Sequence, residues 1–197
     1  CYIFKRNDSS RMSHYFWVFI EKFGTVLLKL SLIVLLARLL TPKDFGLYAI
    51  VAIIVSMATL LVDSGMGGSL IKKKDITDLD YSTVFIFNFV VAVGLYVLIY
   101  LFSPMIAEFY KEYELELLIK ISSLNLIIRS LTLIQFAKLS KELKFQSQSF
   151  IYIISLLFSI VFAYYLAINN YGYWALVGQQ LLESCLVVIF TLMLSRY

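Results

Sequence analysis

Ionisable side chains lie inside otherwise apolar runs of this sequence, at Lys29, Asp63, Lys120, Arg129 and Glu183. A charge in the middle of a membrane span costs from about 2.5 to more than 10 kcal/mol, so such residues usually face water, an ion or an anionic ligand. With two cysteines and one histidine, the chain offers no metal-ligand spacing. We therefore expect binding or transport at these positions, without a cofactor or a metal.

Arg129 is the strongest candidate for contact with an anion. Ser122, Asn125, Arg129 and Thr132 follow one another at spacings that confine them to an arc of roughly 80° on a helix. Helical side chains lean toward the helix N-terminus, which carries Arg129 toward the bilayer midplane and away from the nearer cytoplasmic face. Its planar donors match phosphate oxygens, so we assign Arg129 and Asn125 to a substrate cavity.

Lys29, Gln180 and Glu183 are the other expected cavity residues. Lys29 and Lys120 both lean toward the membrane face that they already lie near, so snorkelling is an alternative for each. Glu183 lies about ten residues into its span, roughly 15 Å deep. It is either a cavity residue or the partner of Arg129 in a buried ion pair.

Asp63 and Glu183 are candidates for coupling transport to an ion. Asp63 lies near the inner end of its apolar run, so a helix-end or loop contact is the alternative for that carboxylate. Serine, threonine and amide side chains form stripes on the other runs, as at Ser155 and Ser159. Such stripes line a polar passage or form hydrogen bonds between helices.

Composition places the chain in the membrane. Of its 197 residues 61% are hydrophobic and 15% are charged, and the mean hydropathy is +0.86, whereas soluble domains carry about 25% charged residues. The net charge of +4 does not indicate nucleic acid, because no basic run alternates with stacking aromatics. Anionic headgroups of membrane lipids are the expected partners of the surface lysines.

Six apolar runs are long enough to cross a bilayer as helices. They cover residues 16–40, 45–66, 82–103, 115–136, 150–168 and 173–194. The sequence therefore predicts an all-α polytopic membrane protein with a cytoplasmic tail over residues 1–15 and a six-helix bundle over residues 16–197. Pro42, after Thr41, marks a tight turn and the start of the second helix.

Basic residues favour an orientation with both termini in the cytoplasm. The segments that would lie inside hold Lys5, Arg6, Arg11, Lys22, Lys72, Lys73, Lys74, Lys138, Lys141, Lys144 and Arg196. The segments that would lie outside hold Arg38, Lys43 and Lys111, and the outer stretch "SPMIAEFYKEYELE" is acidic.

Several stretches resemble the polysaccharide-biosynthesis transporters, in order and with matching spacing. They are "FWVFIEKFGT", "ARLLTPKDFGLYAI", "DSGMGGSLIKKKDITDLDYSTVFIFN", "PMIAEFY", "LSKELKF" and "YGYWALVGQQLLES". These transporters include the O-antigen and exopolysaccharide flippases of the multidrug/oligosaccharidyl-lipid/polysaccharide exporter superfamily. The resemblance runs from about Phe16 to the end of the chain.

The resemblance implies a MATE-like fold of two six-helix bundles, of which this chain is the N-terminal one and a C-terminal bundle is missing. It implies a secondary transporter, not an enzyme, in the bacterial inner membrane. Its substrate would be undecaprenyl-pyrophosphate-linked oligosaccharide, moved from the cytoplasmic to the periplasmic leaflet by alternating access.

Three alternatives stand beside this reading. A drug exporter of the same superfamily would more naturally present acidic residues to its cationic substrates. A membrane glycosyltransferase would need carboxylate-rich loops, whereas Asp75, Asp78 and Asp80 adjoin a lysine triplet and read as a solvated loop. A nonfunctional truncated helical fragment is the third.

Overall fold

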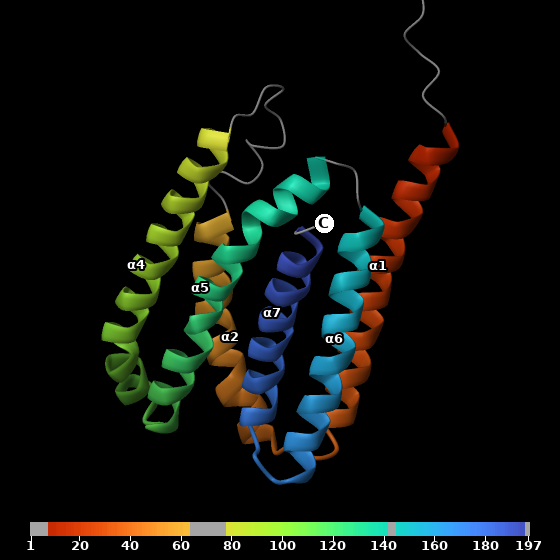
Figure 1. Cartoon of the computed structure of the whole chain (residues 1–197). Coiled ribbons are helices and arrows are strands. Elements are labelled where there is room, and N and C mark those ends of the chain that lie inside the picture. Colours follow the sequence, from red (N-terminus) through yellow and green to blue (C-terminus); the bar gives the residue numbers. More distant parts are fainter. Residues whose placement is uncertain (1–7, 64–77, 142–144, 196–197) are drawn as a thin grey trace, which may run out of the picture.

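The fold is all-α, as the sequence predicts. The computed structural model describes the backbone of residues 8–63, 78–141 and 145–195, and the side chains of residues 22–62, 82–132 and 146–193. The helices in these ranges are α1 (Asp8–Leu36), α2 (Pro42–Asp63), α4 (Asp78–Tyr110), α5 (Glu114–Lys141), α6 (Phe145–Ile168) and α7 (Trp174–Ser195). Short connections join α1 to α2, α4 to α5 and α6 to α7 at one end of the bundle (Figure 1).

Four helices are long and apolar enough to cross a membrane, judged on the residues whose side chains are described. They cover Pro42–Val62, Ser82–Tyr110, Gln146–Ile168 and Trp174–Met193. The described part of α5 does not reach the same composition, because it carries Glu116, Lys120 and Arg129. For α1, side chains are described from residue 22 onward, which leaves too short a stretch to test the expected span.

The arrangement of the helices explains why α5 can be more polar than its neighbours. Helix α1 packs on α6, α6 on α7, α7 on α5 and α5 on α4, while α2 also packs on α5 (Figure 1). Surrounded by α2, α4 and α7, α5 buries serine and asparagine beside leucine, as at Ser122, Asn125 and Leu126. A helix enclosed by protein needs less apolar surface than one that faces lipid.

Two apolar clusters hold the bundle together. Helix α2 contributes a stripe at helical spacing to the larger cluster, formed by Leu47, Val51, Val55, Ala58 and Val62. This spacing puts the five side chains on one face, where they pack with residues of α4, α5 and α7. The smaller cluster joins α1 to α6 and α7 through leucine and alanine side chains, including Leu36, Ala163 and Ala175.

Small residues bring α6 and α7 close together. Ser155, Ser159, Ala163 and Ala167 recur every fourth residue along α6 and are all buried. On α7, a Cβ added to Gly178 would lie 2.9 Å from Cδ1 of Leu166 and 3.2 Å from Cε1 of Phe162. Close approach at small residues is the usual basis of helix association in membranes.

Helix α4 runs further than the sequence suggests. The apolar run predicts a span ending at residue 103, but α4 continues through Pro104 to Tyr110. Proline has no amide hydrogen to give the carbonyl of Tyr100, and the hydroxyl of Ser103 donates to that carbonyl at 2.8 Å instead. Most of the expected acidic loop is therefore helix, and the turn is confined to residues 111–113.

The α1–α2 and α6–α7 turns are linked by one carboxylate. Thr41 and Asp44 form a capping box at the start of α2, with the Thr41 amide 2.9 Å from Oδ2 of Asp44 and the Asp44 amide 3.3 Å from Oγ1 of Thr41. Pro42, the first residue of α2, is suited to this position because its φ is already helical and an amide there has no partner within the helix. The other oxygen, Oδ1 of Asp44, accepts a hydrogen bond from the Tyr173 amide at 3.1 Å.

A second link at this end joins the α1–α2 turn to the α4–α5 turn. The ammonium of Lys43 lies 2.8 Å from Oε2 of Glu112.

Burial raises the pKa of the Tyr173 hydroxyl above its usual value, and the negative charge of Glu114 adds to the effect. We call residues 37–41, 111–113 and 169–173 together the turn end of the bundle.

Candidate functional site

Glu183 is the centre of a polar network inside the bundle. It lies nine residues after Trp174, the first residue of α7, which puts it about 14 Å along that helix. Its Oε1 lies 3.4 Å from the ammonium of Lys29 on α1. Its Oε2 accepts a hydrogen bond of 2.8 Å from the side-chain amide of Gln179.

The network extends from α7 to α6 and α2. The amide of Gln179 also donates to Oγ of Ser159 at 3.2 Å, and Ser159 donates onward to the Leu156 carbonyl at 2.8 Å. The hydroxyl of Tyr48 on α2 donates to Oε1 of Gln180 at 3.3 Å. We call Lys29, Tyr48, Ser159, Gln179, Gln180 and Glu183 the α7 network.

The two ends of the ion pair differ in their surroundings. The Glu183 side chain is 19% exposed and the Lys29 side chain is 54% exposed. Glu183 has a partner on each carboxylate oxygen, whereas more than half of the Lys29 side chain is exposed. The geometry therefore combines a fixed carboxylate with an accessible ammonium.

Asn125 and Arg129 follow α5 away from the turn end. Asn125 is 4% exposed and its Oδ1 has no hydrogen-bond partner among the described residues; the same is true of Oγ of the buried Ser122 and Ser155. Arg129 is exposed. In the part of the chain whose side chains are described, Glu183 pairs with Lys29, and no ion pair joins it to Arg129.

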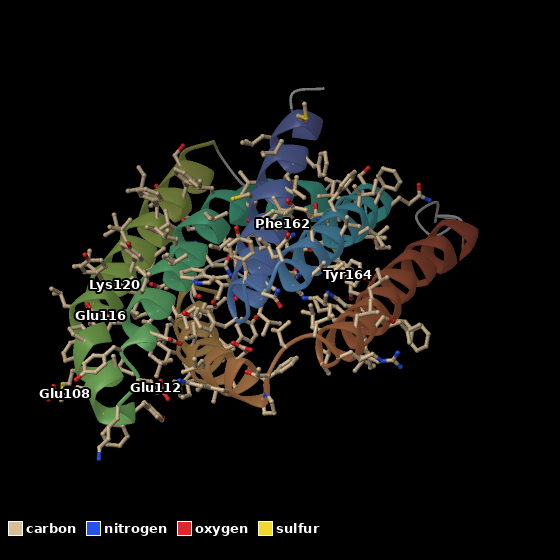
Figure 2. All side chains as sticks on the ribbon, turned by 90° about the horizontal axis from the view of Figure 1, so that it is seen from below. Glu108, Glu112, Glu116, Lys120, Phe162 and Tyr164 are labelled. Atoms are coloured by element: carbon tan, nitrogen blue, oxygen red, sulfur yellow. The ribbon has the colours of Figure 1, made fainter. Side chains whose placement is uncertain are left out.

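Lys120 belongs to a separate contact near the turn end. Its ammonium pairs with Glu116 one turn earlier on α5, and it lies 4.5 Å from the centre of the Tyr100 ring. Figure 2 looks along the bundle from the turn end and shows Glu116 and Lys120 on the side of α4 and α5, near Glu108 and Glu112 and away from Phe162. The Lys120 side chain thus extends toward the N-terminus of α5, the direction that the snorkelling alternative predicts.

Two other expectations concern coupling and metal binding. Asp63 is the last residue of α2, and its side chain lies outside the described residues. Within the described ranges, no group of three or more histidine, cysteine, aspartate or glutamate side chains could hold a metal ion.

Most hydroxyl groups on the expected polar stripes are satisfied within their own helix. Thr25, Ser56, Thr59 and Thr132 each donate to a carbonyl three or four residues earlier. Such local bonds compete with contacts to neighbours. These hydroxyl groups use their donor within their own helix, and the side chains of Gln179 and Gln180 make contacts between helices.

Sequence reasoning missed the pairing of Lys29 with Glu183 and the part played by Tyr48. A signal for the pairing was present: Lys29 lies seven residues before the end of α1 and Glu183 nine residues after the start of α7. Both ends lie toward the turn end, so the two charges sit at similar depth. Tyr48 gave no such signal, because it is one aromatic residue in an apolar run.

These features define a helical polytopic membrane protein with a charged, hydrogen-bonded network among its helices. The chain belongs to the family described as "Polysaccharide biosynthesis protein", whose model matches residues 35–197. This confirms the resemblance found in the sequence to the polysaccharide flippases.

Curated relatives carry names from the same area of biology. The chain is 30% identical over 178 residues to the teichuronic acid biosynthesis protein TuaB of Bacillus subtilis, covering 88% of this chain and 36% of the relative. It is 24% identical to the succinoglycan biosynthesis transport protein ExoT of Rhizobium meliloti, covering 92% and 37%. It is 30% identical over 93 residues to the lipopolysaccharide biosynthesis protein WzxC of Escherichia coli, covering 47% and 19%.

The chain thus spans little more than a third of the length of TuaB and ExoT. No solved structure matches it.

Proposed function

We propose that this chain forms one bundle of a secondary transporter that flips lipid-linked oligosaccharide across the bacterial cytoplasmic membrane by alternating access. Membership of the polysaccharide biosynthesis family and the transport role printed for ExoT support this class of cargo. The observation that carries the proposal is the exposed side chain of Lys29, whose ammonium pairs with Glu183 at the mid-depth of an apolar bundle. The transporter is not an enzyme, and its chemistry is binding and release.

The α7 network offers what a pyrophosphate-linked sugar needs. Lys29 supplies a charge that can approach the pyrophosphate, and the amide of Gln180 supplies donors and an acceptor for sugar hydroxyls. Asn125 has an acceptor without a partner among the described residues. Arg129, further along the bundle on α5, is the second proposed contact for the anionic group.

The proposed orientation has the turn end in the periplasm and both termini in the cytoplasm, with six membrane helices in all. The asymmetry of basic residues supports it. A second bundle would complete the passage in a MATE-like arrangement, and the greater length of TuaB and ExoT is consistent with this. Coupling of transport to an ion through Asp63 or Glu183 remains part of the proposal.

The pairing of Glu183 argues against the drug-exporter alternative. A carboxylate that binds cationic drugs must be available to them, whereas Glu183 already has Lys29 on one oxygen and Gln179 on the other. In the described bundle, the accessible member of the pair is the cation. This favours an anionic cargo.

Export of surface polysaccharide tests the proposal. In the intact transporter, expressed in a strain that lacks its own flippase, Lys29→Gln should reduce surface polysaccharide at least ~tenfold at normal protein level, because charged hydrogen bonds contribute about 1.5 to 3 kcal/mol. Lys120→Gln is the matched control, since Lys120 contacts Glu116 and Tyr100 outside the network, and it should retain export. Full export by Lys29→Gln would contradict the proposal.

A further inference from the structure

Glu183 and the proposed anionic cargo compete for the same ammonium. Lys29 lies 3.4 Å from Oε1 of Glu183, which is an ion-pair distance for a lysine. An ammonium that contacts a carboxylate has fewer donors left for a phosphate oxygen. Cargo that binds through Lys29 therefore competes with Glu183 for the donors of this ammonium.

The structure shows which partner can leave. Glu183 is fixed on α7, because Oε2 accepts from Gln179, and Gln179 is itself 7% exposed and bonded to Ser159 on α6. The Lys29 side chain is 54% exposed and has a flexible four-carbon stem. Lys29 is thus the movable member of the pair and Glu183 is the stationary one.

We propose that Glu183 is an internal counter-ion that occupies Lys29 in the empty bundle and is displaced from it by the pyrophosphate of the cargo. The inference rests on the proposed function and adds a role that differs from substrate contact: Glu183 lowers the affinity of the site. It keeps Lys29 from binding weaker anions such as single phosphates of ordinary lipids, and it recaptures Lys29 when cargo leaves.

Competition predicts that a substitution at Glu183 raises the affinity of the site for the anion instead of lowering it. Glu183→Gln keeps the size of the side chain and an oxygen that can accept from Gln179, but it removes the charge that attracts Lys29. An exposed ion pair contributes about 0.2 to 1 kcal/mol, so release of Lys29 should tighten anion binding by up to roughly fivefold. A residue that contacts the cargo directly would weaken binding when changed.

The experiment measures binding of geranylgeranyl pyrophosphate to the intact transporter in lipid nanodiscs, with geranylgeranyl monophosphate as the second probe. Glu183→Gln should bind both the pyrophosphate and the monophosphate up to roughly fivefold more tightly, because the same competitor is removed for each. Lys29→Gln should bind both more weakly than the unchanged protein. The double variant should bind like Lys29→Gln, because Glu183 acts only through Lys29.

A second readout follows Lys29 directly. Acetylation of Lys29 by an amine-reactive reagent, measured by mass spectrometry without any ligand, should be faster in Glu183→Gln. The matched control is Glu116→Gln, which releases Lys120 from a similar pair on α5 and should change neither anion affinity nor the labelling of Lys29. If Glu183→Gln does not accumulate, Glu183→Asp takes its place, since the shorter side chain withdraws the carboxylate from Lys29, and affinity should rise by a smaller factor.

Two failures are distinguishable. Unchanged or weaker binding in Glu183→Gln, while Lys29→Gln still loses affinity, overturns the counter-ion role and leaves the proposed function standing. Unchanged binding in Lys29→Gln removes Lys29 from the anion site, and the proposed function fails together with the inference.

Discussion

The carboxylate of Asp44 accepts a hydrogen bond from the backbone amide of Tyr173, and this contact joins two turns that are separated by most of the chain. The same carboxylate completes the capping box of α2 through Thr41. A single side chain therefore starts one helix and locates the start of another, since Tyr173 immediately precedes Trp174 of α7.

Loss of this carboxylate should destabilise the bundle. Asp44→Ala removes a cap and an inter-turn hydrogen bond, and we expect about 1 to 2 kcal/mol of lost stability, seen as a lower melting temperature in detergent. Glu108→Gln is the control, since it is an exposed change near the same end of the bundle and should leave the melting temperature unchanged. An unaffected Asp44→Ala variant would mean that water replaces the contact without loss.

The contact between α6 and α7 predicts an unequal response of two helical glycines. Gly178→Ala would place a Cβ 2.9 Å from Cδ1 of Leu166 and 3.2 Å from Cε1 of Phe162, so these side chains must shift and offset the gain in helix propensity. The variant should be less stable than Gly94→Ala by about 1 kcal/mol or more. A Cβ at Gly94, in α4, meets nothing within 4 Å. Gly94→Ala should therefore be neutral or stabilising by up to about 1 kcal/mol. Equal melting temperatures for the two variants would contradict the close approach of α6 and α7.

The proposed orientation can be tested with single cysteines in a background without Cys1 and Cys185. Tyr113→Cys and Tyr171→Cys lie at the turn end, where both side chains are exposed, and should react with a membrane-impermeant maleimide applied from the periplasm. Their neighbours Lys111 and Asn170 have φ of 56° and 61° and are less suitable, because cysteine is strained in that region. Ser9→Cys should react only after the membrane is opened. Periplasmic labelling at Ser9 would reverse the topology.

Arg129 should matter for export independently of Glu183. In the intact transporter, Arg129→Lys should retain partial export and Arg129→Ala should abolish it at normal protein level, because lysine keeps the charge but not the planar fork. Surface polysaccharide and transporter abundance are measured together. If Arg129→Ala lowers abundance and adding Glu183→Ala restores both abundance and export, the two residues act as a structural pair, against the present assignment.

The helices and their turns were largely readable from the sequence, because long apolar runs and a threonine-proline start are local signals. The start of α2 at Pro42 is an example. The length of α4 could not be predicted from the sequence, since a proline normally ends an apolar helix. In α4 the hydroxyl of Ser103 donates to the carbonyl that Pro104 leaves without an amide, which no local pattern in the sequence indicates.

The residues of the candidate site could be predicted from the sequence, but the contacts between them could not. Lys29, Gln180 and Glu183 stood out as polar residues in apolar runs, yet the partner of Glu183 depends on which helices are neighbours. Helix α1 packs on α6 and not mainly on α2, its successor in the chain, and such non-sequential packing leaves no mark on the spacing within either helix.

That packing order also has a consequence for biogenesis. Helix α1 is the first of these helices to leave the ribosome, while α6, on which it packs, and α7, which carries Glu183, are synthesised last. During translation Lys29 therefore reaches the membrane before Glu183 has been synthesised. Without this partner, the ammonium would be costly to place in hydrocarbon. Until the hairpin of α6 and α7 is inserted and supplies Glu183, we expect the Lys29 ammonium of the nascent α1 to be kept in contact with water, lipid headgroups or protein at the insertion site.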